Sequence, residues 1–181
     1  SLTVIGSANM DIGGYSHGPL TPGDSNPGRV RFLTALGGDV YADAIERQLT
    51  NMGIDLSLSL RLQNEHTSTY LFIADEKGDM SVAVNDMGIY RHQTRAYFES
   101  VLPELNRCRA VLLDANLSEE ALVFLAENVR VPLFADAVSA AKAPRLRPVL
   151  GGLTAFKPNR MEAELLSGVR IDGWDGARLA A

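Results

Sequence analysis

The stretch "RAVLLDANLSEEALVFLAENVRVPLFADAV", residues 109–138, decides the fold, because it holds a strand, a helix and a second strand in direct succession. Its two apolar runs each end in an aspartate. The segment between them opens with Ser118, a residue type that is favoured at helix N-caps. Strands that alternate with helices indicate a parallel sheet covered by helices on both faces. The sequence therefore predicts an α/β fold with a mostly parallel central sheet flanked by helices.

The same alternation continues on both sides of this stretch. "LTVIG", residues 2–6, predicts a buried first strand, and residues 68–86 predict a hairpin whose turn is "EKGD". Residues 13–32 hold Gly, Pro, Ser and Asn between short runs, which indicates loops and small strands. Helices are also predicted over residues 39–53, 94–105 and 160–168, the last closed by Gly168, and a strand within residues 153–159.

The composition is that of one globular domain, with 181 residues, of which 46% are hydrophobic and 22% charged. The net charge of −5 argues against a broad nucleic-acid-binding surface, although a small anionic ligand needs only a few donors. Cys108 is the single cysteine, which excludes an intrachain disulfide and a cysteine-based zinc site. The sequence has no long apolar run and no signal-peptide pattern at its start. We therefore expect a cytoplasmic protein with no membrane and no nucleic-acid partner.

Polar side chains follow three of the predicted strands. In an open α/β sheet such strand ends lie along one edge, which is the usual ligand site. Each of these residues could equally be a loop residue or a helix cap. They are Asp114 and Asn116 in "DAN", Asp136 and Ser139 in "DAVS", and Lys157, Asn159 and Glu162 in "KPNRME".

The segment "KPNRMEAELLSG", residues 157–168, allows two interpretations. Asn159 lies at the predicted start of the helix, and Glu162 follows three residues later. This spacing is that of a capping box, in which the glutamate reaches back to the cap. The same amide and carboxylate could instead lie near a phosphate-bound Mg²⁺, which prefers oxygen ligands.

The segment resembles the N-x-x-E motif of the ribokinase-type (PfkB) sugar and nucleoside kinases. Other segments are similar to that family in the same order, so the resemblance covers essentially the whole chain: "TVIGSANMDI", "TALGGDVYADAIERQLTNMGID", "TSTYLFIADEKGDM", "DANLSEEAL" and "ADAVSAAKA". Within the family, "IGSANMDIGGYSH", "DSNPGRVRF", "STYLFIAD" and "AVNDM" are most similar to pseudouridine kinases. The resemblance implies a partial ribokinase-like domain over residues 1–181, with a small β lid formed by residues 13–32 and parts of 56–84.

The resemblance also implies roles for the residues that match. Asn9 and Asp11 would bind sugar hydroxyls, because an amide and a carboxylate together donate to and accept from a diol. Asp11 could instead cap a turn. Asn159 and Glu162 would organise Mg²⁺ and water around the phosphates of ATP. Further candidates, each of which could instead serve local backbone structure, are Asp24, Asn26, Thr67, Thr69, Asn85 and Asp86 for the substrate, and Asp136 and Lys157 for ATP.

Two parts of the family pattern are absent from this sequence. The G-A-G-D turn, whose aspartate is the base and whose N–H groups face the phosphates, does not occur, so the catalytic base is not assigned. Phe32 runs directly into Leu33, although the family has a Gly-Gly substrate loop and a helix at this point. We expect "GRVRF" to be a returning lid strand and "LTAL" the end of a core strand. We expect a segment to be left out between them, because a true deletion would fuse the two strands over an unfilled core.

The function that the resemblance implies is ATP- and Mg²⁺-dependent phosphorylation of the 5′-hydroxyl of pseudouridine. One alternative is a kinase for another nucleoside or for a simple sugar such as ribose. Another is a non-catalytic protein that binds a nucleoside or sugar on the same fold, which the missing base would fit. Exposed lid strands also favour a homodimer, because unpaired strand edges invite pairing between subunits.

Overall fold

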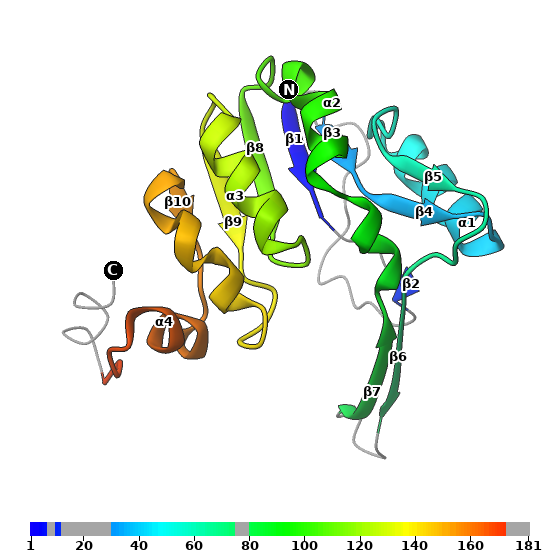
Figure 1. Ribbon diagram of the computed structural model, residues 1–181. Helices are drawn as coiled ribbons and strands as arrows, with labels where there is room; N and C mark the ends of the chain where they lie inside the picture. Colours follow the sequence, from blue (N-terminus) through cyan, green and yellow to red (C-terminus); the bar gives the residue numbers. More distant parts are fainter. Residues whose placement is uncertain (7–9, 12–29, 75–79, 173–181) are drawn as a thin grey trace.

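The computed structural model describes residues 1–6, 10–11, 30–74 and 80–172 (Figure 1). Its central sheet has five parallel strands in the order β10-β9-β8-β1-β3. The strands are β1 (Leu2–Ile5), β3 (Val30–Leu33), β8 (Ala110–Asp114), β9 (Leu133–Asp136) and β10 (Ala155–Phe156). The predicted parallel sheet, and the strand–helix–strand unit over residues 109–138, are confirmed.

The main core lies on one face of this sheet. Three helical segments cover that face, namely α2 (Arg95–Leu105), α3 (Glu119–Asn128) and the 3-10 helix η2 (Ala143–Gly152). Inward-facing strand residues such as Ile5, Val111 and Leu113 are fully buried beneath them. Val4, Leu112 and Phe134 are cross-strand neighbours on the opposite face and are only half-buried. Among the described residues the sheet is therefore closed on one face and partly open on the other.

The helix ends follow the cap residues in the sequence. Ser118 accepts a hydrogen bond from the Ala121 backbone N–H at 3.2 Å and so begins α3, as predicted. α4 (Arg160–Ser167) ends at Gly168, whose φ of 72° lies in the left-handed region that glycine adopts without strain. α1 (Val40–Asn51) occupies the predicted range, and Asp39 is its N-cap.

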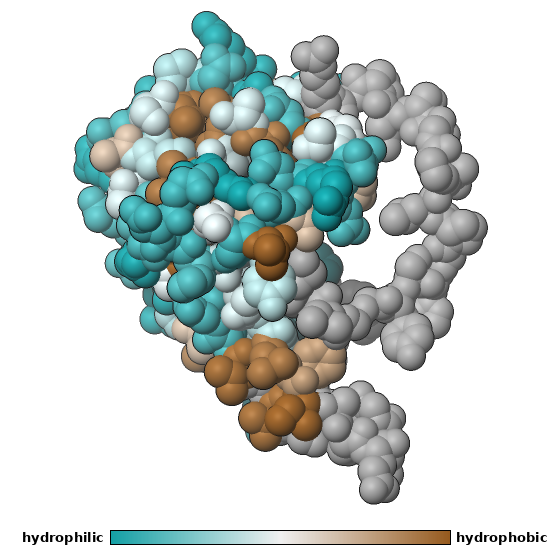
Figure 2. Space-filling view, turned by 90° about the vertical axis from the view of Figure 1, so that its right-hand side faces the viewer, coloured by the Kyte–Doolittle hydropathy of each residue, from teal (hydrophilic) through white to brown (hydrophobic). Residues whose placement is uncertain are grey.

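A second sheet projects from the base of the molecule (Figure 1). It consists of the predicted hairpin, β6 (Thr69–Ala74) and β7 (Met80–Asp86), with β2 (Met10–Asp11) paired parallel to the start of β6. Figure 2 shows an apolar patch on this hairpin. The patch consists of the cross-strand pairs Leu71–Val84 and Ile73–Val82, whose side chains are 56–64% exposed.

The junction at Phe32 and Leu33 differs from the prediction. Residues 30–32 do not return as part of a lid, because they pair in register with β1 in the central sheet, and Leu33 is fully buried beside Ile5. The chain leaves the sheet at Thr34 and forms β4 (Ala35–Gly37), which pairs with β5 (Leu60–Leu62) in a separate two-stranded sheet. Two short strands therefore replace the single fused strand that was expected for a deletion.

Buried polar groups beside this junction are incompletely satisfied. Thr34 is fully buried, and its Oγ1 has no hydrogen-bond partner in the described part of the chain. Gln93, which follows the 3-10 helix η1 (Gly88–His92), donates from Nε2 to the Leu33 carbonyl at 3.3 Å, while its own Oε1 is also unpartnered there. Such atoms are uncommon in folded proteins because their desolvation is costly.

Candidate functional site

The carboxyl ends of the five parallel strands lie along one edge of the sheet, as the sequence predicts. Asp114 at the end of β8 is the register partner of Asp136 at the end of β9. Gly6, which follows β1, lies so close to Asp114 that a Cβ atom there would be 2.6 Å from Asp114 Oδ2. The ends of the three adjacent strands β9, β8 and β1 thus bring together two carboxylates and Gly6, which has no side chain.

The loop after β8 is held by its own side chains and by side chains that follow β9. Asp114 accepts hydrogen bonds from the Asn116 backbone N–H at 2.9 Å and from Asn116 Nδ2 at 3.0 Å. Lys142 donates from Nζ to Asn116 Oδ1, and Arg145 donates to the Ala115 carbonyl at 3.1 Å. Asp114 and Asn116 therefore stabilise the local turn, which was one of the two interpretations of "DAN".

Lys142 was not among the site residues predicted from the sequence. It follows β9, yet its ammonium reaches the loop after β8 and lies 3.5 Å from Met87 Sδ, just beyond β7. Burial lowers the pKa of Lys142. The negative charge of nearby Asp114 opposes this shift, whereas the positive charge of Arg145 adds to it. A partly buried cation thus lies where the central sheet meets the hairpin. The only signal in the sequence is a lysine a few residues beyond a strand end.

The loop after β9 contains a strained backbone. Asp136 is exposed, and its Oδ1 accepts from the Val138 backbone N–H at 2.7 Å. Val138 has a φ of 64°, a conformation that β-branched residues rarely adopt. Such strain persists only where the surrounding contacts impose it, and it is typical of binding loops. The carboxylate of Asp136 keeps one oxygen that makes no hydrogen bond within the described chain, so its assignment to ATP stays a prediction.

The capping box at the start of α4 is present. Asn159 Oδ1 accepts from the Glu162 backbone N–H, and Glu162 Oε2 accepts from the Asn159 backbone N–H, both at 2.9 Å. Glu162 is only 5% exposed, whereas Asn159 and Lys157 are exposed. The capping interpretation is thereby confirmed for this geometry.

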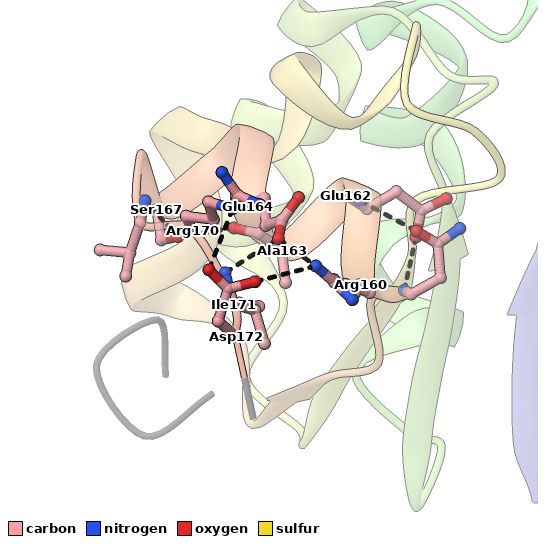
Figure 3. A network of polar contacts seen from close by, with 10 residues as sticks. Arg160, Glu162, Ala163, Glu164, Ser167, Arg170, Ile171 and Asp172 are labelled. Atoms are coloured by element: carbon pink, nitrogen blue, oxygen red, sulfur yellow. Dashed lines mark hydrogen bonds and ion pairs between the residues drawn. The ribbon is translucent and has the colours of Figure 1, made fainter. Parts of the chain in front are cut away.

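A polar network on α4, away from the capping box, fixes the chain that follows this helix (Figure 3). Glu164 Oε1 accepts from the Ile171 backbone N–H at 2.8 Å and from Arg160 Nε at 3.2 Å. These contacts lower the pKa of Glu164, and the hydrogen bond from the Ile171 backbone has the largest effect. Asp172 forms ion pairs with Arg160 at 3.4 Å and with Arg170 at 3.0 Å. This network anchors the carboxyl-terminal end of α4 and leaves the capping box to fix the other end.

The residues near α4 can contribute to a Mg²⁺ site only in part. The described residues contain no group of three or more His, Cys, Asp or Glu that could hold a metal ion. Glu162 uses Oε2 for the capping box, and its Oε1 makes no hydrogen bond to the described residues. One carboxylate oxygen fits Mg²⁺, because this ion usually keeps several waters and takes one or two protein carboxylates.

The predicted substrate residues of the hairpin lie together at its base. Thr69 and Asp86 are cross-strand partners, and the Asp11 backbone pairs alongside at Tyr70, the partner of Asn85. Asn85 and Asp86 are exposed, and Asp86 Oδ1 accepts from the Gly88 N–H at 3.1 Å. This arrangement brings candidate groups from β2, β6 and β7 to one end of the second sheet.

Thr67 is the exception among these candidates. It is buried, and its hydroxyl satisfies the Gly37 backbone N–H at 3.0 Å. The alternative that this threonine serves backbone structure is therefore confirmed. Asn9, Asp24 and Asn26 lie outside the described residues, as does the side chain of Asp11.

The chain is similar to characterised kinases over most of its length. The sequence profile of the "pfkB family carbohydrate kinase" matches residues 23–181. Pseudouridine kinase of Escherichia coli is 37% identical over 204 residues, which cover 99% of this chain and 65% of that protein. Guanosine-inosine kinase of Exiguobacterium acetylicum is 25% identical over 195 residues, or 94% of this chain and 64% of that protein.

Solved structures show the same fold. A carbohydrate kinase from Agrobacterium tumefaciens superimposes with a TM-score of 0.77 at 25% identity, over 99% of this chain and 66% of that one. Ribokinase of Arabidopsis thaliana, complexed with ribose and ATP, gives a TM-score of 0.74 at 17% identity, over 99% of this chain and 66% of that one.

This chain is shorter than the relatives that it matches. It spans 65% of the length of the Escherichia coli protein. The matched span of 204 residues is longer than the 181 residues of this chain, so the alignment includes positions for which this chain has no residue. The expected additional segment between Phe32 and Leu33 stays a prediction.

Proposed function

Because this chain belongs to the pfkB family of carbohydrate kinases, we propose that the whole protein transfers the γ-phosphoryl group of ATP to the 5′-hydroxyl of pseudouridine. The observation that carries this proposal is the 37% identity to the Escherichia coli pseudouridine kinase over 99% of this chain. The similarity to the guanosine-inosine kinase supports a nucleoside as the broader acceptor class.

One group of residues would bind the acceptor nucleoside, and a second group would bind Mg²⁺ and ATP. Asn9 and Asp11 would hold the sugar hydroxyls beside the base of the hairpin. Asn159 and Glu162 would hold Mg²⁺ and its water at the phosphates of ATP, assisted by Lys157 and Asp136. The ion, when bound, would neutralise the charge that develops on the phosphates. The catalytic base is not assigned to any residue of this sequence.

The second sheet would act as a small lid, to which residues 13–29 would also contribute. Closure of a lid over the acceptor excludes water and so limits wasteful ATP hydrolysis. Thr69, Asn85 and Asp86 would face the nucleoside from the base of this lid, and Asp24 and Asn26 are proposed to bind the same nucleoside. The position of the Asp11 backbone beside Tyr70 supports this proposal.

We further propose that the protein is a cytoplasmic homodimer that pairs through this lid. The apolar patch formed by Leu71, Ile73, Val82 and Val84 is exposed in the monomer, and large exposed patches usually mark contact surfaces. Light scattering of the full-length protein after size exclusion tests the dimer. A Leu71→Lys/Val84→Lys double variant should be monomeric, whereas an unchanged mass for that variant would exclude this interface.

The decisive test is an ATP-consumption assay of the full-length protein with pseudouridine, uridine, guanosine and ribose. Pseudouridine should give the highest kcat/KM, and the product should carry the phosphate on the 5′-oxygen. Preference for another nucleoside or for ribose would select the alternative kinases. Binding of the nucleoside with no ATP consumption would select a non-catalytic binding protein.

A further inference from the structure

The turn that begins α1 packs directly against the segment that leads into the hairpin. A Cβ atom on Gly37 would lie 2.4 Å from the Glu65 carbonyl oxygen, and one on Gly38 would lie 2.2 Å from the Gln63 carbonyl oxygen. Gly38 also donates its N–H to the Glu65 carbonyl at 3.1 Å. Only glycine permits this approach of two backbones, so residues 37–38 and 63–65 form one rigid contact.

Asp39 extends this contact to Thr67 with both carboxylate oxygens. Its Oδ2 accepts from the Thr67 backbone N–H at 2.6 Å, and its Oδ1 accepts from Thr67 Oγ1 at 2.7 Å. Oδ1 also accepts from the Ala42 N–H at 2.9 Å, which is the N-cap bond of α1. A helix cap needs only one oxygen. The second oxygen of Asp39 is therefore committed to the segment before β6.

The charged state of Asp39 suits this role. Burial by itself would raise its pKa, but the hydrogen bonds from Thr67, Ala42 and Tyr41 outweigh burial and lower it. The carboxylate therefore remains ionised at neutral pH, and hydrogen bonds to an ionised acceptor are stronger than those between neutral groups.

Thr67 lies two residues before the start of β6, the strand with which β2 pairs. β6 begins at Thr69, and β2 pairs with β6 through Met10–Thr69 and Asp11–Tyr70. The hydrogen bonds between Asp39 and Thr67 are thus joined, through the covalent chain of residues 67–70, to the strand pairing that holds the backbone of Asp11. Within the described residues, the caps of α2, α3 and α4 make no such second contact, since Thr94, Ser118 and Asn159 bond within their own helix ends.

We propose that Asp39 is a positioning residue that fixes the start of β6, and through it the Asp11 backbone, in the geometry that the acceptor nucleoside requires. This inference rests on the proposed function and names a further residue for the same site. Asp39 itself would touch neither substrate nor ATP. Its loss should therefore weaken use of the acceptor more than use of ATP.

The test compares Asp39→Asn and Thr67→Val with two controls in the full-length protein. Asparagine keeps an oxygen for the helix cap but turns an N–H₂ group toward the Thr67 N–H. Valine keeps the shape of Thr67 and removes its hydroxyl. Ser118→Ala removes the cap of α3 without touching β6, and Thr67→Ser keeps the hydroxyl.

Hydrogen exchange should show faster exchange of the amides of residues 67–71 in Asp39→Asn and Thr67→Val, and no change there in the controls. In steady-state kinetics the two variants should lower kcat/KM for pseudouridine at least tenfold, while the KM for ATP stays within twofold of wild type. Thr67→Ser should retain nearly full activity. The double variant should lose little more than either single one, because both remove the same contact.

Unchanged exchange at residues 67–71 in Asp39→Asn would overturn the inference. A kinetic loss no larger than that of Ser118→Ala, or equal changes in the KM values for acceptor and ATP, would overturn it as well. Failure of the proposed function is distinguishable, because the wild-type protein itself would then prefer another acceptor to pseudouridine or would consume no ATP with any acceptor.

Discussion

Replacement of Glu162 by Gln separates the two roles that its position allows. The side chain is 5% exposed, and its Oε2 accepts from the Asn159 backbone N–H at 2.9 Å. The amide oxygen of glutamine can accept the same hydrogen bond, and glutamine is a normal member of the capping box. What Glu162→Gln removes is the negative charge at the amino end of α4, worth about 0.3–1 kcal/mol of stability. Glu162→Ala also removes the hydrogen bond and should cost roughly 1–2 kcal/mol.

The two variants should therefore differ in stability but agree in their response to Mg²⁺. If the carboxylate helps to hold the ion, the Mg²⁺ concentration for half-maximal ATP consumption should rise at least about tenfold in both, the usual scale for groups that support a bound metal. Glu164→Gln is the matched control, since it makes the same change on the same helix within the Arg160–Ile171 network.

The assay is a Mg²⁺ titration of ATP consumption by the full-length protein, together with urea unfolding of each variant. A Mg²⁺ titration of Glu162→Gln that matches wild type would refute the metal role and leave the capping box as the sole function of this residue. An equal shift in Glu164→Gln would show that the charge of the helix, rather than this carboxylate, sets the response.

Three further predictions use other parts of the structure. Asp11→Ala should nearly abolish phosphorylation, and activity within a factor of a few of wild type would rule out the diol contact. Asp55→Asn should lower stability at pH 7 by about 1 kcal/mol in urea unfolding. Hydrogen bonds from Ser57 and the Arg31 guanidinium hold the pKa of Asp55 at about 2, below its ordinary 3.8, although its side chain is 35% exposed and solvent screening weakens the effect. This stabilisation is present above pH 3.8 and should disappear as the pH falls toward 2. Equal free energies of unfolding for wild type and Asp55→Asn at pH 7 would contradict this prediction. Thr34→Val should be neutral or stabilise the protein by about 1 kcal/mol, because the buried hydroxyl has no partner in the described chain; destabilisation by a similar amount would mean that an additional segment supplies one.

Local signals in the sequence predicted the elements whose ends are set by one or two residues. Ser118 and Gly168 mark helix ends because each satisfies backbone groups within its own turn, which needs no tertiary partner. The alternation of strand and helix over residues 109–138 likewise determines a parallel pair through chain geometry alone. These features are independent of what lies elsewhere in the protein.

Features that depend on distant partners were not predicted. "GRVRF" has the composition of a lid strand, yet Phe32 pairs with Val4 in the central sheet because Leu33 is thereby buried. Val40 at the start of α1 and Met52 at its C-cap are 74% and 59% exposed, so the helical spacing of apolar residues alone did not identify the buried face. Lys142 was missed for the same reason, since only the fold brings its ammonium to Asn116.

The alternatives of cap and ligand at the sheet edge are not mutually exclusive. A carboxylate has two oxygens and about four acceptor positions, so a hydrogen bond to its own loop leaves capacity for a ligand. Asp136 uses Oδ1 for the Val138 N–H, and Glu162 uses Oε2 for the Asn159 N–H, each at a strand or helix end. Such a bond also fixes the orientation of the side chain before any ligand arrives, which lowers the entropic cost of binding. A residue type chosen to stabilise a turn is therefore also suited to hold a phosphate-bound cation, and only a variant such as Glu162→Gln, which keeps the turn and removes the charge, can distinguish the two roles.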